Sequence, residues 1–90
     1  MGVFLDELIK LTESIIAIRD SKLTDKTKFD LIFSSYFSEK IYYLFLEMNI
    51  NLDWYNPDMD YIDDVNAYVR AVVSKVEEIK TIRSVLNDRT

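Results

Sequence analysis

Residues 53–64 combine acidic and aromatic side chains without any basic residue. Five aspartates and three aromatic residues occur in this segment, and no lysine or arginine lies among them. Aromatic side chains supply contact area at protein interfaces, and charge of one sign speeds association with an oppositely charged partner. The segment therefore predicts a binding surface for a basic protein partner, formed by Asp53, Trp54, Tyr55, Asp58, Asp60, Tyr61, Asp63 and Asp64.

A purely structural role accounts for part of the same segment. The run Asn56-Pro57-Asp58 is typical of a helix start, where the carboxylates of Asp58 and Asp60 would face the positive end of the helix dipole. The aromatic residues could equally cover the core. A helix start leaves the carboxylates of Asp53, Asp63 and Asp64 unexplained, so the structural and the partner-binding interpretations both stay open.

The acidic residues do not match a known metal-binding pattern. An EF-hand loop beginning at Asp58 would place Ile62 at the fifth position and Val69 at the twelfth, where that loop needs oxygen ligands. Helical nucleotide pyrophosphohydrolases hold magnesium with acid pairs spaced three residues apart on two neighbouring helices. Asp60 and Asp63 supply one such pair, and the chain has no second one. We expect no metal and no cofactor, and a carboxylate–metal nucleotide hydrolase is a distant alternative.

The composition also argues against other enzyme classes. The chain contains no Cys and no His. Their absence excludes disulfides, thiolate nucleophiles, zinc sites with sulfur or nitrogen ligands, and the usual general base near neutral pH. We therefore expect no catalytic residues and a protein that is not an enzyme.

The charge balance also bears on nucleic-acid binding. The net charge is −5, which is the wrong sign for neutralising phosphates. A small basic cluster after the first expected helix is diluted by Asp20 and Asp25, so we expect no direct contact with nucleic acid; its members are Arg19, Lys22, Lys26 and Lys28. The acidic segment could instead imitate phosphates and occupy the groove of a nucleic-acid-handling protein.

Three amphipathic helices are expected to carry these residues, in a single helical domain over residues 1–90. One Gly and one Pro are too few turn residues for a sheet-rich fold. Apolar residues at alternating spacings of three and four predict helices at about 3–19 and 58–87. Thr24 is the expected N-cap of a helix over about 25–48, and a polar, aromatic loop over 49–57 follows it. The predicted fold is an all-α compact bundle of three main helices.

Two of these helices have more apolar surface than one chain can cover. The second is apolar on nearly every side and is expected to be buried on nearly every side. A strand at Ile41–Leu46 is an alternative, but nothing else in the chain could pair with it. The third helix would exceed the first in length by about 18 Å. Association of two chains resolves both excesses, so we expect a homodimer.

The expected location is the cytoplasm. The N-terminus lacks a basic region and reaches acidic residues at Asp6 and Glu7, unlike a secretory signal. The longest apolar run, Ile41–Leu46, is far too short to span a membrane. The abundance of Ile, Lys, Asn and Tyr is typical of AT-rich coding, which suggests a low-GC bacterium, its phage or a plasmid.

The segment Trp54-Tyr55-Asn56-Pro57, flanked by Asp53 and Asp58, resembles small acidic helical immunity proteins that block a nuclease toxin. Those proteins carry adjacent aromatic residues followed by Pro in an acidic loop and short helix. The resemblance covers about a dozen residues, with an extra Asn before the Pro, and does not extend to the first two helices. It implies an inhibitor of a basic partner. We therefore expect a non-enzymatic interaction protein that inhibits or regulates another protein, with a structural or assembly protein as the alternative.

Overall fold

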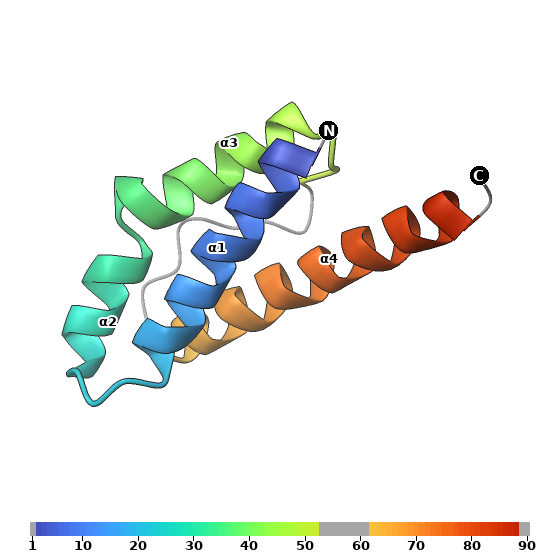
Figure 1. The fold of residues 1–90 in the computed structure, drawn as a ribbon. Coiled ribbons are helices and arrows are strands. Elements are labelled where there is room, and N and C mark those ends of the chain that lie inside the picture. Colours follow the sequence, from blue (N-terminus) through green and yellow to red (C-terminus); the bar gives the residue numbers. More distant parts are fainter. Residues whose placement is uncertain (1, 53–61, 89–90) are drawn as a thin grey trace.

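The computed structural model describes residues 2–52 and 62–88, and the side chains of residues 3–52 and 65–84. These residues are helical or in turns, and no strand occurs among them. The elements in chain order are α1 (Gly2–Arg19), α2 (Asp25–Ile32), a π-helical turn η1 (Ser35–Glu39), α3 (Lys40–Glu47) and α4 (Ile62–Asp88) (Figure 1). The all-α fold class is therefore confirmed, and the strand alternative at Ile41–Leu46 is excluded. The expected helix start at residues 56–58 lies outside the described residues.

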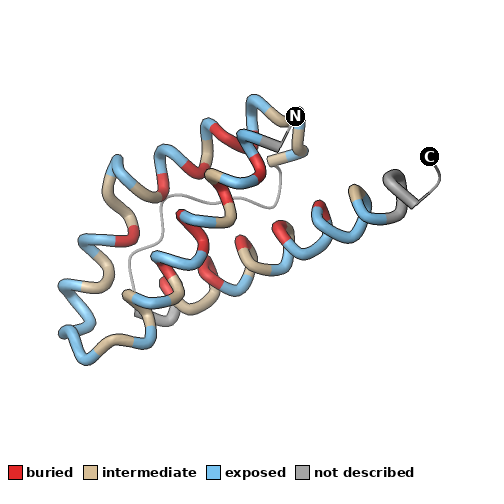
Figure 2. The backbone as a smooth tube through the Cα atoms, viewed as in Figure 1, coloured by how far each residue is buried: buried red, intermediate tan, exposed pale blue. Residues whose placement is uncertain are grey.

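Helix α1 occupies the centre of the arrangement. It packs against α2, α3 and α4, and α2 also packs against α4. Figure 1 shows α1 between α3 and α4, with the C-terminal part of α4 diverging from it. The buried apolar residues of the described helices form one core, and Figure 2 marks their positions along α1, α2, α3 and α4.

Local hydrogen bonds stabilise the connection between α1 and α2. The Thr24 side chain accepts a hydrogen bond from the backbone N–H of Thr27 at 3.2 Å, so Thr24 is the N-cap that the sequence predicts. The Lys28 ammonium donates to the carbonyl of Arg19 at 2.7 Å. Because Arg19 is the last residue of α1, this bond satisfies a carbonyl that the helix leaves without an internal partner.

The expected continuous helix over 25–48 is wrong, because it is divided after α2. Ser34 has extended backbone angles, φ −81° and ψ 166°, and its hydroxyl donates to the Leu31 carbonyl at 2.7 Å. Serine side chains compete with the helix for backbone groups in this way, and serine pairs are common sites of helix kinks. Phe33 and Ser34 therefore separate α2 from η1 and α3, which occupy the rest of the expected range.

The division changes which apolar residues are buried. Ile32, Ile41 and Phe45 are fully buried on the two sides of the break. Tyr36 and Tyr43, in contrast, are 64% and 55% exposed, and Leu31 and Leu46 are also exposed. The expectation that this part of the chain is buried on nearly every side is therefore wrong. A kink rotates the faces of the two segments, so that one apolar stripe is buried and another is left at the surface.

The apolar residues that the spacing predicts for the two long helices, α1 and α4, include most of their buried side chains. In α1 the core positions include Leu8, Leu11 and Ile15. In the described part of α4 the buried side chains are Val65, Tyr68, Val69, Val72, Val76 and Ile79. Ile82, near the C-terminal end of α4, is 51% exposed because α4 has diverged from α1 there. The side chains of Ile62 and Leu86 lie outside the described residues.

Candidate partner-binding surface

The predicted partner-binding residues fall almost entirely outside the described part of the chain. Six of them lie there: Asp53, Trp54, Tyr55, Asp58, Asp60 and Tyr61. Asp63 and Asp64 lie on α4 directly after Ile62, but the structure does not describe their side chains. The described residues therefore neither bring these eight side chains together nor separate them, and the acidic surface stays a prediction.

Ten charged residues of the described part form five ion pairs, most of them with close neighbours in the sequence. Within helices or directly at their ends lie Arg19–Asp20 at 3.0 Å, Lys26–Asp30 at 3.2 Å, Lys75–Glu78 at 3.2 Å and Lys80–Glu77 at 3.4 Å. Lys40 and Glu7 form a fifth pair at 2.8 Å, which joins α3 to α1. The described side chains include ten acidic and ten basic residues, so their charges sum to zero.

In two of these pairs the pKa of one member is shifted. The hydrogen bond from the Arg19 guanidinium lowers the pKa of Asp20 below its ordinary value. The hydrogen bond to Glu7, reinforced by its negative charge, raises the pKa of Lys40. In each case the ionised form of the shifted group, the Asp20 carboxylate or the Lys40 ammonium, is stabilised by its partner.

The basic residues after α1 also serve local structure. Arg19 and Lys26 pair with Asp20 and Asp30, and the Lys28 ammonium caps the end of α1. Three of the four basic residues in this cluster therefore already have partners within the chain. This arrangement differs from the free basic face that binds a phosphate backbone.

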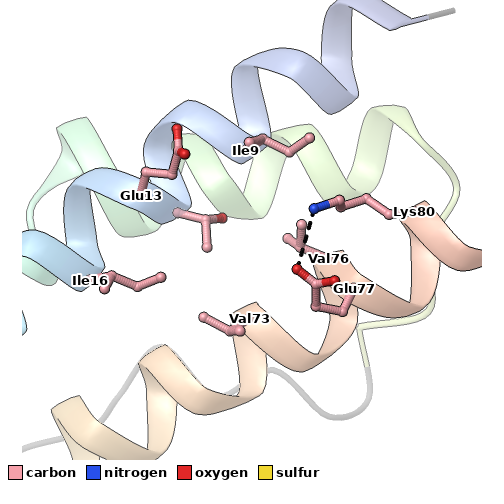
Figure 3. Close-up of a pocket in the computed structure, with 8 residues that line it drawn as sticks. Ile9, Glu13, Ile16, Val73, Val76, Glu77 and Lys80 are labelled. Atoms are coloured by element: carbon pink, nitrogen blue, oxygen red, sulfur yellow. Dashed lines mark hydrogen bonds and ion pairs between the residues drawn. The ribbon is translucent and has the colours of Figure 1, made fainter.

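An open groove of about 120 Å³ lies between α1 and α4. Helix α1 contributes Ile9, Thr12, Glu13 and Ile16, and α4 contributes Val73, Val76, Glu77 and Lys80. In Figure 3 Ile16 and Val73 point toward one another across the groove. The Thr12 hydroxyl donates to the Leu8 carbonyl at 2.7 Å, so this polar group is satisfied within α1. The lining therefore combines aliphatic side chains with one buried hydroxyl that already has a hydrogen-bond partner, and its charged residues are Glu13, Glu77 and Lys80.

The rim of the groove carries one paired and one unpaired carboxylate. Glu77 forms its ion pair with Lys80, on the α4 side. Glu13, on the α1 side, is exposed and has no charged partner among the described residues. Sequence reasoning missed this groove, although the widening of the two apolar stripes by Ile9, Ile16 and Val73 was a visible sign of it.

The described residues hold no group of three or more potential metal-ligating side chains. None of the described helices combines the length and apolar character needed to cross a membrane. Every deeply buried side-chain nitrogen or oxygen in the described part has a hydrogen-bond partner.

Comparison of the chain with protein-family models, with curated proteins and with solved structures found no match.

Proposed function

We propose that this chain is a small, non-enzymatic interaction protein that binds and inhibits or regulates a basic or nucleic-acid-handling protein. The acidic segment over residues 53–64 is the proposed contact surface. The single observation that carries the proposal is the placement of charge. The whole excess of −5 lies in this segment, because the remaining residues contain 11 acidic and 11 basic side chains.

The local pairing of charges on the described helices supports this assignment. Five ion pairs join acidic and basic residues of α1, α2, α3 and α4 or their ends. Exposed pairs of this kind contribute little to stability, but they cancel one another's field at a distance. A basic partner would therefore be attracted mainly by residues 53–64, and their aromatic side chains would supply the contact area.

Charge reversal in the acidic segment tests the proposal. We would replace Asp58, Asp60, Asp63 and Asp64 by Lys and compare the proteins captured by the variant and the wild type from cells that encode the chain. The control variant carries the same change in charge at four exposed acidic residues outside the segment: Asp6, Glu39, Glu47 and Glu78.

The captured partner is then purified, and its association is followed by stopped-flow fluorescence at several salt concentrations. The segment variant should associate more slowly, with a weaker dependence on salt, whereas the control variant should keep most of the wild-type rate. If both variants associate equally fast, the negative charge of residues 53–64 has no special role in binding.

A second candidate function is a structural or assembly role through self-association. Tyr43 and Leu46 are both exposed on α3, and residues three positions apart share a helix face. Two chains could bury these side chains against one another in the proposed homodimer. In that case the acidic segment would confer only solubility, and the oligomeric state is the measurement that separates the two candidates.

A further inference from the structure

We propose that the groove between α1 and α4 is a second docking site, which binds an amphipathic helix of a protein partner. That helix inserts one large apolar side chain and places a Lys or Arg against Glu13. The site is separate from the acidic segment on which the proposed function rests, since none of the residues that line the groove belongs to that segment.

The size and lining of the groove favour a single apolar anchor. Ile9, Ile16, Val73 and Val76 present aliphatic surface on both walls. An apolar cavity of roughly 150 Å³ holds a benzene-sized molecule, so a volume of about 120 Å³ suits one aliphatic side chain such as Leu or Ile. Anchors of this kind, set into a preformed pocket, dominate the affinity of many interfaces.

The dimensions of the groove favour a helix as the element that carries the anchor. Its lining extends from Ile9 to Ile16 on α1 and from Val73 to Lys80 on α4. Seven residues of α-helix span about 10 Å, or two turns. A helix bound in a groove uses side chains at positions i, i+3 or i+4, and i+7, which cover the same two turns.

The charges at the rim decide between a foreign helix and a second copy of this chain. Glu77 is neutralised by Lys80, whereas Glu13 has no charged partner among the described residues. The lining therefore has a net charge of −1, from two glutamates and one lysine. Two copies placed groove to groove would bring two such surfaces together. A partner helix with a Lys or Arg beside its anchor would neutralise the excess, so the groove suits a basic amphipathic helix better.

Selection of defined peptides tests this assignment. The probe is a phage-displayed library of helix-forming 15-residue peptides, randomised at positions i, i+3, i+4 and i+7, selected on the wild-type protein and depleted on the Val73→Glu variant. Enriched peptides should share one large apolar residue and at least one Lys or Arg among these positions. In fluorescence anisotropy they should bind Val73→Glu at least about tenfold more weakly than the wild type.

A charge swap tests the role of Glu13. Glu13→Lys should weaken binding of the selected peptide by up to about fivefold, as expected for an exposed ion pair. The same peptide with its Lys or Arg changed to Glu should bind Glu13→Lys more tightly than it binds the wild type. Glu47→Lys is the matched control, because Glu47 is also exposed but lies on α3, outside the groove lining.

Three results would overturn the proposal. The first is that no peptide is enriched, or that the enriched peptides lack the apolar anchor or the cation. The second is equal binding to wild type, Val73→Glu and Glu13→Lys. The third is a wild-type dimer in sedimentation that either variant dissociates, which would assign the groove to a second copy. Circular dichroism reports whether Val73→Glu is folded; if it is not, the exposed Glu13 variant decides the second and third results.

Discussion

Asn49 ends α3 in a left-handed conformation, with φ of 59°. The Ile50 N–H donates to the Phe45 carbonyl at 3.0 Å and the Asn49 N–H to the Leu46 carbonyl at 3.0 Å, the two bonds of a Schellman motif. Residues other than Gly and Asn adopt this conformation at a cost of about 1–2 kcal/mol. We expect Asn49→Ala to lower the free energy of unfolding by about 1 kcal/mol and Asn49→Gly to preserve or raise it, as measured by urea denaturation. Equal stabilities of the Ala and Gly variants would contradict this interpretation.

Lys40 also permits a prediction at the level of one side chain. The hydrogen bond with Glu7 raises its pKa above the ordinary value of 10.5, so its ammonium is stabilised in the folded state. This contribution to stability is fully present below the unfolded-state pKa and disappears as the pH rises through the raised pKa. We expect Glu7→Gln to lower the pKa of Lys40, as measured from its 13Cε shift in an NMR titration. Glu13→Gln is the control, and it should leave the Lys40 titration unchanged.

At the scale of single elements, the short helix α2 depends on its first turn. It has only eight residues, and helices this short are marginal without tertiary contacts and caps. Loss of the Thr24 side chain removes the hydrogen bond to the Thr27 N–H. We expect Thr24→Ala to lower the free energy of unfolding by about 1 kcal/mol, and Thr24→Ser to retain most of it. Thr81→Ala, at an exposed position within α4, should not destabilise the protein, and an equal loss there would contradict the capping role.

At the scale of the whole molecule, one tyrosine links α4 to the end of α2. Tyr68 is only 1% exposed, and its ring lies 5.0 Å from that of Phe33, between centroids. Replacement of a buried aromatic residue by Ala costs about 3–5 kcal/mol, a large part of the roughly 5–15 kcal/mol that stabilises a domain. We expect Tyr68→Ala to lose most of its cooperative unfolding transition in urea. Val3→Ala, at an exposed apolar residue of α1, should change stability by less than about 0.5 kcal/mol.

The oligomeric state is also a property of the whole molecule, and the proposed self-association predicts it. We expect sedimentation equilibrium at micromolar concentration to detect a dimer, because Tyr43 and Leu46 on α3 and Ile82 on α4 are large apolar side chains left at the surface. Tyr43→Lys should shift the protein toward monomer, and its melting temperature should fall at concentrations where the wild type is dimeric, because association stabilises the folded state. A strict wild-type monomer would contradict self-association and would leave the binding of a different protein as the proposed function.

The two candidate sites differ in how far they follow from the chain alone. The acidic segment is defined by residue types within one short stretch, so composition and spacing are enough to propose it. The groove consists of residues up to seven positions apart on two helices that are distant in sequence. Ile16 and Val73 become neighbours only when α1 and α4 pack together, and the unpaired state of Glu13 depends on which charges lie near it.

The sequence by itself determined the all-α class, the extent of α1, the Thr24 cap and the buried stripe of α4. These features are local, since they depend on apolar spacing and on hydrogen bonds a few residues apart. Tertiary structure decided the break at Ser34, the exposure of Tyr36 and Tyr43, and the groove. Periodicity shows which residues share a helix face but not which faces find a partner, because burial depends on contacts between helices far apart in the chain.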